Sequence, residues 1–149
     1  MRQHAKTPSA QAKVRIQALL RQIGLARQDG ICFFAGKEVN GRIHECSGWR
    51  NDGELVLQYD HLNPREKNVS FADSRLGLVI CKGIHGWKSF SDANKKIYDD
   101  AARKYISPAQ RKLWKRVEND HKNYPMGAWE WTKCEMALTQ ELKEIAPKK

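Results

Sequence analysis

Apolar residues recur every three to four positions in the first part of the chain and again in its second half. Between these parts they alternate with polar residues or form short runs. The first periodic stretch predicts a helix over residues 9–28, with Ser9 as its N-cap and Asp29-Gly30 after its end. Its apolar positions are Ala12, Ile16, Leu19, Leu20 and Ile23.

The middle of the chain has the pattern of short strands. The run Ile-Cys-Phe-Phe at 31–34 predicts a short strand, and 39–52 predicts irregular structure. Residues 54–60 alternate apolar and polar positions, as a half-buried strand does. A charged loop at 65–74 then leads to a second apolar run at 76–81, which predicts a strand or an extended segment.

The second half predicts helices. A long helical pattern covers 83–105, with a kink or break near Asp92. Ser-Pro-Ala-Gln at 107–110 is a helix start with a capping box, because serine caps the helix and glutamine follows three residues later. A linker at 124–127 precedes a second capping box, Thr-Lys-Cys-Glu at 132–135, which predicts the start of the last helix.

Together these elements predict a small α+β protein with an N-terminal basic helix and a helical C-terminal half. With 149 residues the chain is the size of one domain. We expect a flexible basic tail at 1–8 and a single domain at 9–149, made of a compact core at 31–92 and a helical extension at 93–149.

The net charge of the chain indicates what kind of partner it binds. The chain has 27 Lys and Arg against 17 Asp and Glu, a net charge of +10 at pH 7. This excess favours a polyanion such as DNA as the binding partner, although a merely soluble basic protein remains an alternative.

No apolar run approaches the roughly 20 residues that a membrane span needs. The four widely spaced cysteines and the lack of an apolar signal sequence favour reduced thiols in the cytoplasm.

The candidate chemistry lies where the strands end. Asp60 ends the alternating segment and His61 follows it, and His85 follows the second apolar run by four residues. Phosphodiester hydrolysis needs an activated water and a cation, for which a neutral histidine and a carboxylate are suitable groups. We expect His61 to be the general base and Asp60 and His85 to bind the metal, provided that Asn63-Pro64 turns the chain so that Asp60 and His61 face one site. Alone, an Asp-His dipeptide is common by chance, and His85 is equally consistent with a surface histidine.

A family resemblance sharpens this expectation. Gln-Tyr-Asp-His-Leu-Asn-Pro at 58–64 resembles the "DHxxP" start of HNH endonucleases, and Leu-Val-Ile-Cys-Lys-Gly-Ile-His-Gly-Trp-Lys at 78–88 resembles their "LLCxxCHxxK" finish. The order of elements also resembles phage recombination nucleases of the NinG/Rap and endonuclease VII type, with a weaker similarity to NinG at 129–135. The resemblance covers about 31–88. It implies a ββα-metal core, a metal-dependent DNA endonuclease acting on branched or single-stranded recombination intermediates, and a phage protein in the cytoplasm of its bacterial host.

The chain departs from this family at its cysteines. Relatives often hold a structural zinc on two Cys-x-x-Cys knuckles, but here each knuckle keeps one cysteine, Cys32 and Cys81. A four-thiolate site there is impossible, so we expect two core thiols facing each other and no structural zinc. The alternative is a site in which His44 or Cys46 joins these two cysteines.

Two further departures concern the loop and the metal. The middle asparagine of the HNH name is missing near 73–76, and Ser89 stands where some relatives have a third metal-binding histidine. The remaining ligands, Asp60 and His85, favour Mg²⁺ or Mn²⁺ completed by water and phosphate.

The other basic residues are candidates for contact with the DNA backbone, although solvated helix faces explain many of them equally well. The candidates are Arg15, Arg21, Arg65, Lys67, Lys82, Lys88, Lys95, Lys96, Arg111 and Lys115. Trp129 and Trp131, next to a Pro-Gly linker, suggest a homodimer contact, whereas tryptophans are more often core anchors. The rival functions are a non-catalytic HNH-fold DNA-binding accessory protein and a zinc-stabilised basic protein.

Overall fold

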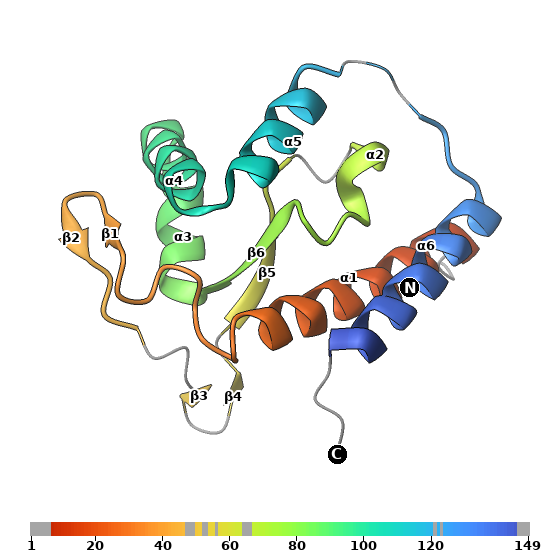
Figure 1. The fold of residues 1–149 in the computed structure, drawn as a ribbon, viewed down its shortest axis with the longest axis horizontal. Coiled ribbons are helices and arrows are strands. Elements are labelled where there is room, and N and C mark those ends of the chain that lie inside the picture. The colour runs from red at the N-terminus through yellow and green to blue at the C-terminus, as the bar shows by residue number, and fades with distance from the viewer. Residues whose placement is uncertain are drawn as a thin grey trace, which may run out of the picture.

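The protein has a mixed α+β fold arranged around one strand hairpin (Figure 1). The computed structural model describes residues 7–46, 50–51, 54–55, 57–63, 67–120, 122 and 124–145. The larger elements are α1 (Pro8–Arg27), β5 (Leu57–His61), β6 (Gly77–Cys81), α3 (Lys82–Phe90), α4 (Asp92–Tyr105), α5 (Pro108–Glu118) and α6 (Ala128–Ile145). In Figure 1, α1 and α6 lie together on one side of the hairpin, and α3, α4 and α5 lie on the other.

The predicted N-terminal helix is confirmed, with a different cap. Thr7, not Ser9, is the N-cap, since its hydroxyl accepts a hydrogen bond from the Ala10 N–H at 3.1 Å. Pro8 then occupies the first turn, where its missing N–H costs nothing. Ala12, Ile16, Leu20 and Ile23 of α1 are buried as its periodicity predicts, and Leu19 is half-buried. Positions 1–6 of the predicted tail lie outside the described residues.

The two predicted central strands pair with each other. β5 and β6 are antiparallel, with Asp60 opposite Leu78 and His61 opposite Gly77. The first residues of the predicted strand, Glu54–Leu55, form a separate short strand, β4, which pairs with β3 (Arg50–Asn51). The charged loop between β5 and β6 also contains a short helix, α2 (Asn68–Phe71), which the sequence did not predict.

The predicted strand at 31–34 is wrong. The chain turns there, with the Ala35 N–H bonded to the Cys32 carbonyl at 3.0 Å, because this segment folds inward to bury Phe34. Just beyond it, the region predicted as irregular contains a hairpin of β1 (Glu38–Val39) and β2 (Arg42–Ile43). The turn residues Asn40 and Gly41 have φ values of +53° and +78°. The Asn-Gly dipeptide is itself a signal for a two-residue hairpin turn, so the sequence contains the information that predicts this hairpin.

In the second half, the predicted break near Asp92 is confirmed. Ser91 separates α3 from α4 and caps α4 by accepting a hydrogen bond from the Asn94 N–H at 3.1 Å. The capping box of α5 is also confirmed. The predicted start of the last helix at 132–135 is wrong, since α6 begins at Ala128 and the Thr132 hydroxyl donates to the Ala128 carbonyl inside the helix.

Two hydrophobic clusters hold the described elements together. The first fills the space between the β5–β6 hairpin and α3, α4 and α5, and includes Ile80, Tyr98 and Trp114. The second joins α1, α2 and α6 through residues such as Ile16 and Trp131. Tyr59 packs against both, so the hairpin is the element that connects them. None of the described helices combines the length and the apolar character that crossing a bilayer requires.

Candidate active site

A cavity of about 300 Å³ lies at the end of β5 and contains all three predicted catalytic residues. Its lining residues are Gln17, Tyr59, Asp60, His61, Leu62, Asn63, His85, Lys88 and Lys95. Asp60 and His61 come from the last two positions of β5, and His85 from α3. The structure therefore brings together residues that are 24 positions apart, as the sequence predicts.

Asp60 is buried and has two partners on the neighbouring helices. The Lys88 ammonium lies 2.7 and 2.6 Å from its two carboxylate oxygens, and the Tyr98 hydroxyl donates to Oδ2 at 2.8 Å. Burial raises the pKa of Tyr98, and the Asp60 carboxylate raises it further, so the phenol stays protonated and donates. His85 and Lys88 are three positions apart on α3, which places both on the face toward the cavity.

His61 leaves β5 on the face opposite to Asp60, as neighbouring strand residues do, and the two side chains both line the cavity because it lies at the strand end. Its Nε2 lies 3.0 Å from the Phe71 carbonyl oxygen, and its ring stacks on the Phe71 ring at 4.8 Å between centroids. Tyr59 contacts the same imidazole edge-on at 5.0 Å. A carbonyl only accepts, so the neutral ring carries its proton on Nε2, and Nδ1 has the acceptor form that a general base needs.

Asn63 also lines the cavity, although its sequence context predicts only a role in the turn after β5. It is 3% exposed, and its Oδ1 has no hydrogen-bond partner among the described residues. An amide oxygen is a hard donor, suited to a water molecule or to Mg²⁺. The cavity thus combines a carboxylate, an amide oxygen, two imidazoles and two ammonium groups, which suffices to bind a cation, activate water and contact a phosphate.

A second group of polar side chains gathers at the other end of the hairpin. The ligand atoms of Cys32, His44, Cys46 and Cys81 all lie within 4.8 Å of one another. Cys81 also caps α3, since its sulfur accepts a hydrogen bond from the Ile84 N–H at 3.4 Å. The pKa of Cys81 is lowered, first by a hydrogen bond from the Cys32 thiol, whose own pKa is raised by that contact and by burial. The predicted contact of Cys32 with Cys81 is confirmed, and His44 and Cys46 join them.

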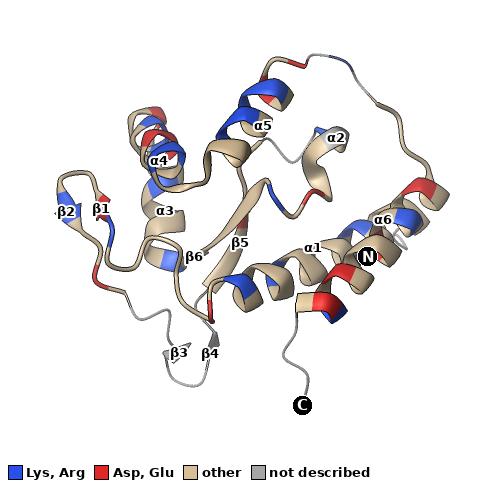
Figure 2. Cartoon of the chain, viewed as in Figure 1, with Lys and Arg blue, Asp and Glu red and all other residues tan. Residues whose placement is uncertain are grey.

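Lys and Arg residues lie along several helices of the protein (Figure 2). The predicted DNA-binding residues among them divide into two groups by their contacts. Several are committed to internal contacts: Arg15 with Glu135, Arg21 with the Leu57 carbonyl, Lys88 with Asp60, Arg111 with the Arg103 and Ile106 carbonyls, and Lys67 with the carbonyls of Val117, Glu118 and Asp120. Lys82, Lys95, Lys96 and Lys115 are exposed on α3, α4 and α5. Lys95 additionally contacts Asp99 at 3.0 Å, and Arg65 lies outside the described residues.

The two tryptophans of α6 differ in their exposure to solvent. Trp131 is 1% exposed and belongs to the second hydrophobic cluster, whereas Trp129 is 62% exposed. Trp131 is therefore a core anchor within the chain, and only Trp129 remains a candidate for contact with a second copy.

Comparisons with protein-family models, with curated proteins and with solved structures give no match. The functional assignment therefore depends on the chemistry of the site.

Proposed function

We propose that this protein is a metal-dependent DNA endonuclease of the HNH type, with the hairpin and α3 forming its ββα-metal core. The observation that carries the proposal is that Asp60, His61 and His85 line one cavity. His61 takes a proton from the attacking water through Nδ1, while its Nε2 hydrogen bond to Phe71 fixes the orientation of the ring. Asp60 and His85 would hold the cation.

Mg²⁺ or Mn²⁺ is the cation that fits these ligands, with the Asn63 oxygen available as a further donor. When bound, it supplies charge stabilisation for the phosphate and the leaving oxygen. Lys88 competes for Asp60 from 2.6 Å, so a cation must share this carboxylate with the ammonium group or displace it. Lys88 lines the same cavity, so its ammonium group is placed to contact the scissile phosphate.

The exposed lysines Lys82, Lys95, Lys96 and Lys115 are the backbone contacts that we retain, with Arg65 beside the site in sequence. The substrate class of branched or single-stranded recombination intermediates and the phage origin are part of the proposal, and they depend on the resemblance of residues 58–64 and 78–88 to HNH and phage recombination nucleases. The cytoplasmic location depends on the widely spaced cysteines, and the homodimer depends on the exposed Trp129.

The test is cleavage of a DNA panel by the full chain in Mg²⁺, Mn²⁺ or EDTA. The panel contains linear duplex, single strand, a fork and a four-way junction. We expect cutting that needs the metal, and loss of cutting by at least about 100-fold in His61→Ala with DNA binding retained, since general-base catalysis contributes that much. Asp60→Asn should be equally inactive, whereas Asp100→Asn, at an exposed position on α4, should cut normally.

Equal loss of binding and cutting in His61→Ala would contradict the role of His61. A specific observation favours one alternative, a non-catalytic DNA-binding protein: both oxygens of Asp60 are already engaged by Lys88. Wild-type protein that binds the panel without cutting it in either metal would establish that alternative.

A further inference from the structure

We propose that Cys32, His44, Cys46 and Cys81 form a Cys₃His site for a structural Zn²⁺, separate from the cavity around Asp60. The sequence disfavoured zinc because both Cys-x-x-Cys knuckles are incomplete. The tertiary structure supplies the missing ligands from a different place, the His-x-Cys segment that follows the β1–β2 hairpin.

The distances suit a tetrahedral ion. Zn–S and Zn–N bonds of about 2.3 and 2.0 Å place tetrahedral ligand atoms roughly 3.5–3.8 Å apart. The four donor atoms already lie within 4.8 Å of one another, and His44 Nε2 is 3.4 Å from the Cys81 sulfur. Closing the set around an ion requires side-chain adjustments of about 1 Å or less.

The chemistry and the burial of these donors identify the kind of metal. Three thiols and one imidazole are soft ligands that select zinc over Mg²⁺ or Ca²⁺. Cys32 is 2% and Cys81 7% exposed, while His44 and Cys46 are half-buried. Four protein ligands leave no position for a substrate, so the site is structural and not catalytic.

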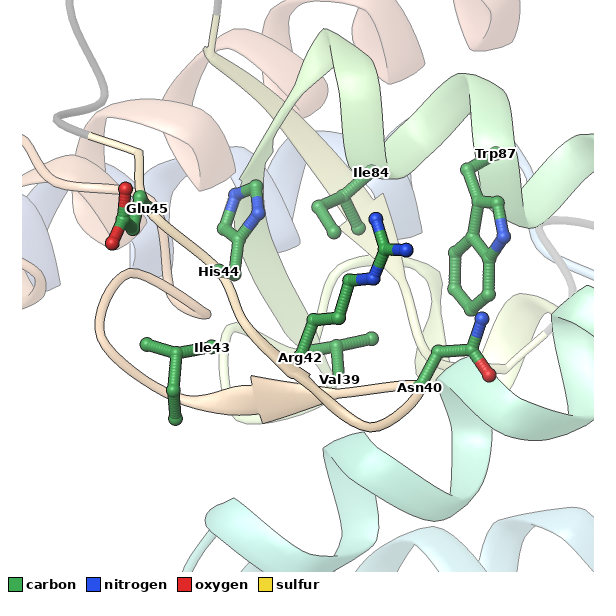
Figure 3. A pocket seen from close by; sticks show the side chains of 8 residues that line it. All are labelled: Val39, Asn40, Arg42, Ile43, His44, Glu45, Ile84 and Trp87. Atoms are coloured by element: carbon green, nitrogen blue, oxygen red, sulfur yellow. The ribbon is translucent and has the colours of Figure 1, made fainter.

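The position of the site gives the ion a clear role. Its ligands come from three segments: the turn after α1, the chain after β2, and the junction of β6 with α3. Backbone hydrogen bonds already join two of them, from Gly36 N–H to the His44 carbonyl and from His44 N–H to the Lys37 carbonyl, both at 2.8 Å. Figure 3 shows His44 beside Ile84 at the start of α3. An ion here would anchor the first turn of the helix that carries His85.

The β1–β2 hairpin is small, and it is otherwise held by the buried Val39 and by hydrogen bonds of the Tyr105 hydroxyl with the Glu38 N–H and carbonyl. Each strand has two residues, and Ile43 is 59% exposed. A cavity of about 450 Å³, lined in part by Val39, His44 and Trp87, separates this hairpin from α3. Two-residue strands are marginal by themselves, so a metal crosslink supplies stability that the apolar contacts do not.

The experiment is to purify the full chain under reducing conditions without chelators and to measure its metal content by elemental mass spectrometry. We expect one zinc per chain in wild type and a large loss in Cys46→Ser and His44→Ala. Cys134→Ser is the matched control, because this fourth cysteine lies on α6 outside the cluster, and it should keep its zinc. Asp60→Asn should also keep it, which separates failure of the zinc site from failure of the nuclease.

A second measurement on the wild type covers the case in which the variants do not fold. Replacement of zinc by Co²⁺ should give the thiolate charge-transfer and intense d–d absorption bands of a tetrahedral cobalt site. Wild-type protein with no stoichiometric metal and no such cobalt bands would overturn the proposal. So would zinc that persists unchanged in folded Cys46→Ser, or a wild-type mass lower by two hydrogens, which would indicate a Cys32–Cys81 disulfide instead.

Discussion

Asp60 is the side chain on which the candidate site depends most. It is 7% exposed, and a buried carboxylate is costly unless it is paired and hydrogen-bonded. Lys88 and Tyr98 meet this requirement, and the Lys88 ammonium also lies 4.6 Å from the centre of the Tyr98 ring. The three side chains form one network, so the effects of changing them should not add.

We expect Lys88→Met to lower the free energy of unfolding by about 3 kcal/mol, because removing one partner of a buried pair leaves a buried charge. The measurement is urea denaturation followed by circular dichroism. Lys82→Met, at an exposed position on the same helix, should change stability by less than about 0.5 kcal/mol. The double variant Asp60→Asn, Lys88→Met should be more stable than the sum of the single changes predicts, by about 2 kcal/mol. Strict additivity would mean that the pair is not energetically coupled.

At the scale of elements, α1 packs closely against the β5–β6 hairpin and contributes Gln17 to the lining of the cavity. Helix α1 comes close to β6 at Gly24, where an added Cβ atom would lie 2.4 Å from the Val79 Cγ2 atom. Val79 is fully buried on β6, so it has no room to move away. Glycine is therefore required at Gly24 by close packing, although it is a poor helix former.

Replacement of two helical glycines by alanine should accordingly change the stability of the protein in opposite directions. Gly24→Ala should destabilise the protein by about 1–3 kcal/mol, because the overpacking cost exceeds the helix propensity gain of about 1 kcal/mol. At Gly86 on α3, an added Cβ meets nothing within 4 Å among the described residues beyond its chain neighbours and the helix backbone, so Gly86→Ala should stabilise the protein by up to about 1 kcal/mol. Thermal denaturation of both variants checks this. A neutral or stabilising Gly24→Ala would show that α1 does not approach β6 so closely.

At the scale of the whole molecule, the two ends of the described chain pack together. α6 lies along α1, joined by the ion pairs Arg15–Glu135 and Arg27–Glu141 and by the second hydrophobic cluster (Figure 1). Surface ion pairs contribute little, so the buried Trp131 is the main source of this contact. Lys13 covers its ring with the ammonium 4.8 Å from the ring centre.

Trp131→Ala should therefore lower stability by about 3–5 kcal/mol, as large core deletions do. Trp129→Ala, two positions away and exposed, should cost less than about 0.5 kcal/mol. Chemical denaturation compares the two variants, and sedimentation of Trp129→Ala against wild type tests the proposed dimer contact. Similar losses in both variants would contradict the packing of α6 on α1.

The sequence by itself determined the parts of the molecule that local rules govern. The period of apolar residues identified α1, and the alternation or clustering of apolar residues identified β5 and β6. The Ser107 capping box marked the start of α5. The sequence also selected Asp60, His61 and His85 as candidates, because the first two end one strand and the third follows the other strand of the same hairpin. Local patterns failed where apolar residues turn inward, as at 31–34.

Only the tertiary structure decided which side chains meet. It assigned Lys88 and Tyr98 to Asp60, and it gave Lys67 the end of α5 as its partner. It also brought His44 and Cys46 to the two knuckle cysteines, which changes the expected metal content of the protein. The same physical reason applies to all three cases. Most of these contacts join residues that are 28 or more positions apart, and the others close a loop whose path depends on how the core packs. Secondary-structure propensity and spacing along the chain do not tell which distant residues come into contact.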